Sequence, residues 1–256
     1  MDKSARMKKL WNGFVLVWSL ITRIRIPKIF MPEEMSLPTA DAIITLPVVG
    51  ALFGVLSVLP ATAVAMAVPR NGAAWIAAGI YTILGWSLHL DGWGDMWDGI
   101  GSGKRGDALR AVMKDTRVGA FGVAGIVLAI GTRASLLSDI DPRHWIAAAA
   151  ISCGVGRFGA NVAIYLGKYP WPEGMARDCV RNFDGRRLLC SLAVACLIIP
   201  VWPEAWAVGM LASSIGGATL ALWASKNMGG VNGDVLGASA VLGEILTMAG
   251  CAALVR

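Results

Sequence analysis

Several apolar segments in this chain are as long as a bilayer is thick, and they constrain its fold more than any other feature. Residues 41–68, 119–140 and 144–166 are the clearest cases. A helix needs about 20 mainly apolar residues to cross the hydrocarbon core of a membrane. Only 16% of the residues are charged, whereas an average soluble domain has about a quarter. The sequence therefore predicts an all-α integral membrane protein.

The apolar segments follow one another along the whole chain, separated by turns rich in proline, glycine and charged residues. They leave no room for a large soluble domain, so residues 1–256 are predicted to form a single membrane-embedded helical bundle. Residues 10–26 carry Trp11 and Trp18 between flanking lysines and arginines, which is typical of an amphipathic helix at the membrane interface. About seven transmembrane helices are expected, at residues 41–68, 73–90, 119–140, 144–166, 188–201, 205–224 and 235–255.

The distribution of Lys and Arg predicts the orientation of these helices. If the N-terminus is cytoplasmic, 18 of the 23 basic residues lie in cytoplasmic segments and three on the other side. This bias also accounts for the net charge of +6 without nucleic acid as a partner. The five cysteines have no metal-binding spacing and are interpreted as small core residues, and no cleavable signal peptide is evident. We expect a multi-pass protein of the cytoplasmic (inner) membrane whose polar motifs face the cytoplasm.

A polar stretch at residues 89–122 interrupts the apolar pattern and carries the strongest candidate site. Asp91, Asp95 and Asp98 are spaced i, i+4 and i+7, which puts their carboxylates on one face of a helix. Three adjacent carboxylates repel one another unless a cation lies among them, and Mg²⁺ prefers such oxygen ligands. The alternative is a solvated acidic helix end, but Trp93 and Trp97 lie between the carboxylates. We predict a catalytic Mg²⁺ site held by the three aspartates.

Basic residues follow the carboxylates and suit a phosphate-containing substrate. Lys114 and Arg117 are predicted phosphate contacts, although cytoplasmic loops collect such cations for topological reasons as well. Asp115, between them, is a candidate fourth metal ligand or general base. His89 closes the preceding apolar segment, where it is either a catalytic group or a hydrogen-bonded structural one.

Charged residues within the apolar segments are further candidates, because ionisable groups are costly inside a bilayer. Arg133 and Arg157 either contact phosphates from inside the bundle or pair with an acidic residue such as Glu244. A second polar patch, around Gly233 and Asp234, should lie on the same face of the membrane as residues 89–122. Asp234 is a candidate partner of that site, and an N-cap of the helix that follows is the competing interpretation.

Four stretches in order along the chain make it resemble the cobalamin synthase family. The central one combines an HLDGxxDxxDG run with a following MKDxRxGxxG run, which is long and specific. The resembling stretches are Thr22-Arg23, Leu46–Gly50 with Gly54, His89–Gly99 with Met113–Gly122, and Gly230–Ala238 with Glu244.

The resemblance implies adenosylcobinamide-GDP ribazoletransferase activity in the last steps of cobalamin (vitamin B12) biosynthesis, nucleotide loop assembly. A hydroxyl of α-ribazole or α-ribazole 5′-phosphate would attack the activated cobinamide, and GMP would leave. It also implies substrate contacts from Arg23 and Gly233, with Mg²⁺ as cofactor. The expected partners are these substrates, the lipid bilayer and a possible second copy of the chain.

The sequence is also compatible with two other functions. A CDP-alcohol phosphotransferase also uses several aspartates and a divalent metal, but its usual motif fits the run after Asp91-Gly92 less well. A transporter would explain the intramembrane charges at positions 133, 157 and 244, but not the collection of polar motifs on one face.

Overall fold

A computed structural model of the protein describes residues 3–32, 39–85 and 87–255. This part of the chain contains helices and no strand. The order of elements is α1 (Lys3–Ile21), η1 (Lys28–Phe30), α2 (Thr39–Ala42), η2 (Ile43–Thr45), α3 (Leu46–Val64), α4 (Arg70–Leu84), α5 (Leu88–Gly101), α6 (Gly106–Met113), α7 (Ala120–Asp139), η3 (Pro142–His144), α8 (Trp145–Leu166), α9 (Arg177–Asn182), α10 (Gly185–Cys196), η4 (Ile199–Val201), α11 (Pro203–Met228) and α12 (Gly233–Leu254).

The predicted all-α, multi-pass membrane architecture is confirmed. Within the described residues, five segments are long and apolar enough to cross a membrane: Thr39–Val64, Ala120–Asp139, Pro142–Leu166, Pro203–Met228 and Gly233–Leu254. Helices α4 and α5 together form a sixth candidate, but they are bent by 94° relative to each other. The bend separates an apolar half, α4, from the polar half that carries the aspartates.

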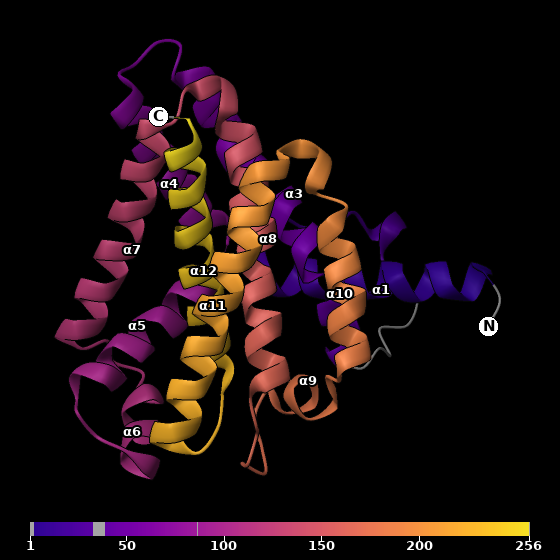
Figure 1. The fold of residues 1–256 in the computed structure, drawn as a ribbon, viewed down its shortest axis with the longest axis vertical. Helices are drawn as coiled ribbons and strands as arrows, with labels where there is room; N and C mark the ends of the chain where they lie inside the picture. Colours follow the sequence, from indigo (N-terminus) through magenta and orange to yellow (C-terminus); the bar gives the residue numbers. More distant parts are fainter. Residues whose placement is uncertain (1–2, 33–38, 86, 256) are drawn as a thin grey trace.

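The number of spans differs from the expected seven. The segment expected at residues 188–201 forms α10, which has only 12 residues, or about 18 Å of helix. That is shorter than the hydrocarbon core of about 30 Å. The chain still reverses direction at every expected turn (Figure 1), so the order of the segments agrees with the prediction even though α10 falls short of a full crossing.

Helix α8 is the centre of the bundle. Of its 22 residues, 17 are buried, and it packs against α3, α11 and α12 (Figure 1). Glycines allow these close approaches: a Cβ at Gly50 would meet the backbone oxygen of Cys153, and one at Gly159 would meet that of Ser213. Small residues at such crossings are typical of membrane helices, whose association depends on close packing.

Helix α1 lies across the vertical helices rather than along them, as expected for an interfacial helix (Figure 1). Its inner face buries Val15, Val17 and Trp18. An ion pair also holds it, because Lys9 Nζ lies 2.7 Å from Asp41 Oδ2. The predicted N-terminal helix is therefore present, although it spans Lys3–Ile21 rather than residues 10–26.

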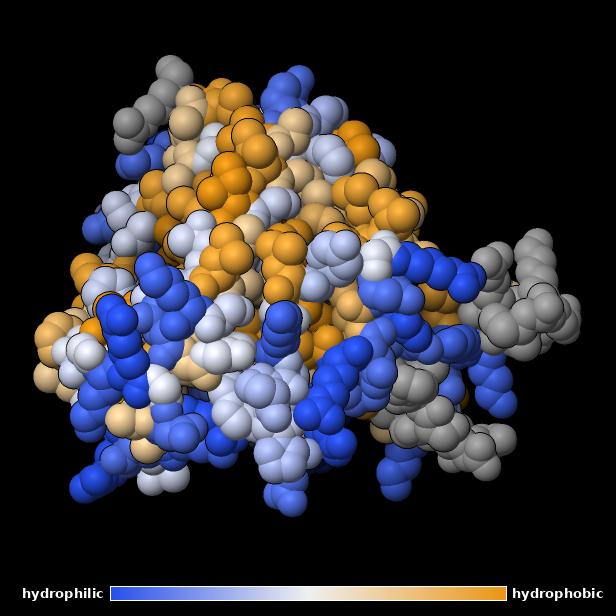
Figure 2. Space-filling view, turned by 60° about the horizontal axis from the view of Figure 1, so that its bottom comes forward, coloured by the Kyte–Doolittle hydropathy of each residue, from blue (hydrophilic) through white to orange (hydrophobic). Residues whose placement is uncertain are grey.

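The polar motifs gather at one end of the bundle. Helices α5, α6 and α9 and the lower end of α11 all lie there (Figure 1). Hydrophilic residues dominate this end, whereas the surface above it is mostly hydrophobic (Figure 2). The fold thus places the candidate site at the boundary between the apolar bundle and water.

Candidate active site

A close approach of α5 to α12 forms the centre of the site. A Cβ at Gly92 would lie 2.7 Å from the backbone oxygen of Asp234 and 2.8 Å from its Cα. A Cβ at Gly237 would lie 3.3 Å from the Cα of His89. Because only glycine at position 92 lets the two backbones come this close, the second polar patch joins the first, as the sequence suggested.

Four carboxylates are close enough to act on one another. The charges that act most strongly on Asp95 are those of Asp234, Asp91 and Asp98. Asp234 is also repelled by Asp91, and it is attracted by Lys114 from the end of α6. Segments more than a hundred residues apart in sequence therefore contribute to a single, strongly negative site with a lysine at its edge.

Asp98 differs from the other carboxylates because it binds backbone amides. Its Oδ2 accepts a hydrogen bond from Gly119 N (2.7 Å) and its Oδ1 accepts one from Gly122 N (2.8 Å). These amides belong to the start of α7, where free N–H groups and the helix dipole favour a negative charge. Each oxygen keeps a further lone pair, so Asp98 fixes α7 and could still act as a ligand.

Asp234 is not the N-cap of α12. Asn232 has that role, since its Oδ1 accepts a hydrogen bond from Val235 N at 3.1 Å. The Asn232 side chain also donates to Asp234 Oδ2 at 2.6 Å. The capping interpretation of Asp234 is therefore wrong, and its carboxylate belongs to the acidic site.

Asp115 and Arg117 form a local ion pair. Arg117 Nε and Nη2 donate to the two carboxylate oxygens of Asp115 at 3.1 and 3.0 Å, and the Arg117 backbone N–H also donates, at 3.0 Å. These hydrogen bonds lower the pKa of Asp115 to about 2. The side chain of Arg117 is 86% exposed, so the pair lies on the water-facing surface of the loop.

The donor chemistry of the site fits Mg²⁺. Oxygen atoms of several carboxylates are the ligands that this ion prefers, and a cation would offset the repulsion that Asp91, Asp98 and Asp234 exert on Asp95. In the described part of the chain, no three acidic, histidine or cysteine side chains already converge as a formed metal site. The three predicted ligands thus share one face of α5 without being drawn to one point.

A buried charge cluster lies deeper in the bundle. Glu244, which is 1% exposed, has Oε2 2.7 Å from Arg133 Nη1 and Oε1 2.7 Å from Arg157 Nη1. Tyr81 donates its hydroxyl hydrogen to Glu244 Oε2 at 2.6 Å, and the Arg133 guanidinium lies 3.8 Å from the centre of the Tyr81 ring. Of the two interpretations of these arginines, the structure supports pairing with Glu244.

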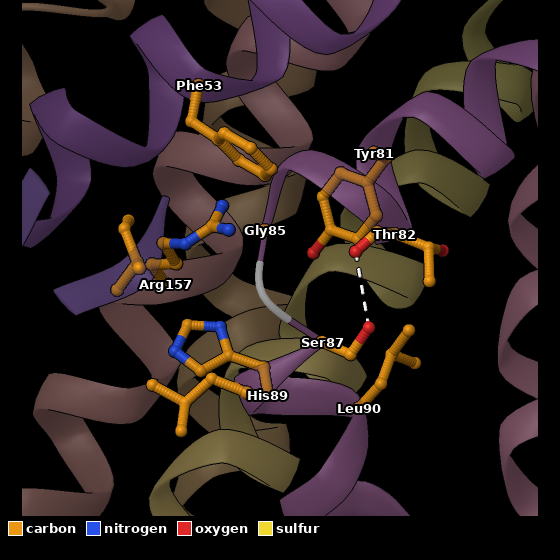
Figure 3. Close-up of a pocket in the computed structure, with 10 residues that line it drawn as sticks. Phe53, Tyr81, Thr82, Gly85, Ser87, His89, Leu90 and Arg157 are labelled. Atoms are coloured by element: carbon orange, nitrogen blue, oxygen red, sulfur yellow. Dashed lines mark hydrogen bonds between the residues drawn. The ribbon is translucent and has the colours of Figure 1, made fainter. Parts of the chain in front are cut away.

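His89 connects the buried cluster to the acidic site. Its imidazole lies beside the guanidinium of Arg157, with Phe53 and Tyr81 on the far side of the same small cavity (Figure 3). That cavity has a volume of about 10 Å³, which is close to the smallest space that holds one water molecule. His89 also lines a second cavity together with Asp91 and Asp234, so it lies between the two parts of the site region.

Two further predicted contacts lie around the bend between α4 and α5 and at the start of α12. The backbone N–H of Arg23 donates to Leu84 O at 2.7 Å, which brings this exposed residue to the end of α4. Gly233 is the first residue of α12 and lines a large cavity next to Asp91 and Asp234. This cavity has a volume of about 360 Å³ and mainly apolar walls.

Comparison with known proteins identifies the family. A profile described as cobalamin-5-phosphate synthase matches residues 13–252. The chain belongs to this family. The match covers every candidate residue discussed above, and it agrees with the resemblance seen in the sequence motifs rather than with a CDP-alcohol phosphotransferase or a transporter.

Individual family members align with this chain over nearly their full length. A protein of Bradyrhizobium diazoefficiens named adenosylcobinamide-GDP ribazoletransferase is 30% identical over 92% of this chain and 95% of its own. Proteins of the same name from Escherichia coli and Syntrophobacter fumaroxidans are 29% and 28% identical, over 91% and 96% of this chain and 96% and 100% of their own. No solved structure matches the chain.

Sequence reasoning missed two members of the site region. Tyr81 is the hydroxyl partner of Glu244, but a tyrosine in an apolar segment gives no signal of such a contact. Asn232 orients Asp234, and its position two residues before an acidic helix start could have suggested a cap.

Proposed function

We propose that this cobalamin synthase family member is an adenosylcobinamide-GDP ribazoletransferase. It would transfer the cobinamide-phosphate part of adenosylcobinamide-GDP to a hydroxyl of α-ribazole or α-ribazole 5′-phosphate and release GMP. The names of its relatives support this assignment. The observation that carries it is the group of four carboxylates with Lys114 at the polar end of the bundle, beside a large apolar cavity.

Asp91 and Asp95, with Asp98 beside them, are the proposed holders of Mg²⁺. Bound there, the ion would neutralise charge on the pyrophosphate and make the phosphorus easier to attack. Its binding would also relieve the repulsion among the carboxylates. Asp98 also has a structural role that needs no metal, because the hydrogen bonds that it accepts from Gly119 N and Gly122 N hold the start of α7 against α5.

The basic residues of the loop after α6 are the proposed phosphate contacts. Lys114 lies near Asp234, where its ammonium would stabilise the negative charge that develops on the leaving GMP. Arg117 is exposed beside it and would meet the outer phosphate or the nucleotide. Arg23 and Gly233 are proposed as further substrate contacts at the entrance to the site.

The attacking hydroxyl must lose a proton to a nearby base. Asp115 suits this role poorly, because its pKa of about 2 and its three hydrogen bonds from Arg117 leave it little tendency to accept a proton. Asp234 is a better candidate, since it lines the large cavity and lies among the other carboxylates. We therefore propose that the Asp234 carboxylate accepts the proton of the attacking hydroxyl.

The active end of the bundle is proposed to face the cytoplasm, and the membrane to be the inner one. The end that carries α5, α6 and α9 is the hydrophilic one (Figure 2), and most of the 23 lysines and arginines lie in the segments assigned to this side. Such an excess of basic residues is typical of cytoplasmic loops.

The test is nucleotide release by the purified protein in detergent. With adenosylcobinamide-GDP, α-ribazole 5′-phosphate and Mg²⁺, the wild type should release GMP, and EDTA should stop the release. Asp95→Asn and Asp234→Asn should lower kcat by about 10² or more, as loss of a metal ligand or base does. Asp141→Asn is the control, because Asp141 lies beyond the other end of α7, where its side chain pairs with the exposed Arg143. Full activity of Asp95→Asn, or no GMP from the wild type, would contradict the proposal.

A further inference from the structure

A large cavity lies directly beside the proposed site, since Asp91 and Asp234 are among its lining residues. Its volume of about 360 Å³ is within the range of about 300–1,000 Å³ that is usual for small-molecule sites. Most of its wall is apolar, with contributions from α1, the segment 39–46, α8 and the residues before α9. Representative lining residues are Leu16, Leu20, Leu46, Ala160, Ile164 and Met175.

One wall of this cavity is different. It is formed by the starts of α5 and α12, and it carries His89, Asp91 and Asp234 among its lining residues. These are the elements that Gly92 and Gly237 bring into backbone contact. A ligand in the cavity would therefore have an apolar surround and two carboxylates at its border.

Contacts between distant segments connect the elements that form the cavity wall. Thr39 Oγ1 donates to Asp178 Oδ2 at 2.7 Å, which joins α2 to α9. Asp41 binds Lys9 of α1 and Arg187 of α10, each at 2.7 Å. These contacts join α1, α2 and α9, and each of these helices contributes residues to the wall of the cavity.

We propose that this cavity binds the aromatic base of the ribazole acceptor. The inference rests on the proposed function and adds the location of one substrate to it. The base would lie between Leu20 and Ile164, and the ribose would reach Asp234. There the hydroxyl O–H gives its proton to the carboxylate, the oxygen forms the new bond to phosphorus, and the bond from phosphorus to the leaving GMP breaks.

The chemistry of the wall distinguishes this occupant from two others. A corrin ring carries amides around its rim, and these would lose their hydrogen bonds to water against an apolar wall. A lipid chain would fit the apolar part, but it gains nothing from two carboxylates at the border. A flat apolar base joined to a hydroxyl-bearing sugar matches both surfaces at once.

The test is a substitution that narrows the cavity, followed by a separate measurement of KM for each substrate. Leu20 lines the cavity and is 40% exposed, so a larger side chain can be accommodated there without unfolding the core. Leu20→Trp should raise the KM for α-ribazole 5′-phosphate by about tenfold through lost apolar contact, while the KM for adenosylcobinamide-GDP stays within about twofold. The KM of Leu20→Trp should rise less for acceptors with a smaller base than for acceptors with a bicyclic base.

The matched control is Leu211→Trp, which makes the same change at a site on α11 that is 66% exposed and does not line the cavity. It should behave as the wild type. A raised KM for adenosylcobinamide-GDP alone would mean that the cavity binds the donor substrate. Unchanged KM values for both substrates would mean that a lipid chain occupies the cavity. Either result overturns this inference while GMP release by the wild type still supports the function; no release by the wild type would instead refute the function itself.

Discussion

The buried cluster around Glu244 gives the sharpest stability prediction. Glu244→Gln removes the negative charge between Arg133 and Arg157 and keeps an acceptor for the hydroxyl of Tyr81. Two guanidinium groups would then lie in the bundle without a counter-charge. Removing one partner of a buried ion pair costs about 3–5 kcal/mol, and the amide's remaining hydrogen bonds favour the lower end. The unfolded fraction should therefore rise by about 10²-fold, since 1.4 kcal/mol is about a factor of ten.

The measurement is unfolding of the purified protein in mixed micelles with increasing SDS, followed by the fluorescence of its 11 tryptophans. The free energy of unfolding of Glu244→Gln should fall by about 3 kcal/mol. Asp141→Asn breaks an exposed pair with Arg143, and exposed pairs contribute little, so this control should unfold as the wild type does. If the two variants unfold alike, the cluster is not the stabilising contact that its geometry indicates.

Two further predictions concern the loop and helix that follow α5. Gly122→Ala would place a methyl carbon 2.9 Å from the carboxylate carbon of Asp98. We expect the free energy of unfolding to fall by about 2 kcal/mol and kcat to fall as well. The control is Gly131→Ala on the same helix, where the added methyl's nearest neighbour is 3.8 Å away, and it should change neither quantity. Arg117→Ala should raise the pKa of Asp115 from about 2 toward its ordinary value of 3.8, as an NMR titration of the carboxyl carbon would detect. The sign follows because a carboxylate without its hydrogen-bonding cation accepts a proton at higher pH; an unchanged pKa would mean that Arg117 does not cause the shift.

Local patterns in the chain were enough to predict the class of fold and to identify the acidic residues of the candidate site. Apolar segments of membrane length need no tertiary information, because each must cross the bilayer as a helix on its own. The i, i+4, i+7 spacing of Asp91, Asp95 and Asp98 likewise follows from one helix, and α5 spans all three. The expectation of seven full spans was less accurate, since hydropathy does not reveal that α10 stops at Cys196 or that the chain bends before Leu88.

Tertiary packing decided what each polar side chain does. Asp98 binds the amides of α7 and Asp234 faces α5, although both looked alike as acidic residues near helix ends. The two intramembrane arginines share a single glutamate from α12. The sequence determined which residues are polar and on which helix they lie, because those properties are local. Only the folded bundle determined their partners, because a hydrogen bond or ion pair depends on which helices approach within a few ångströms, and glycines such as Gly92 set that distance.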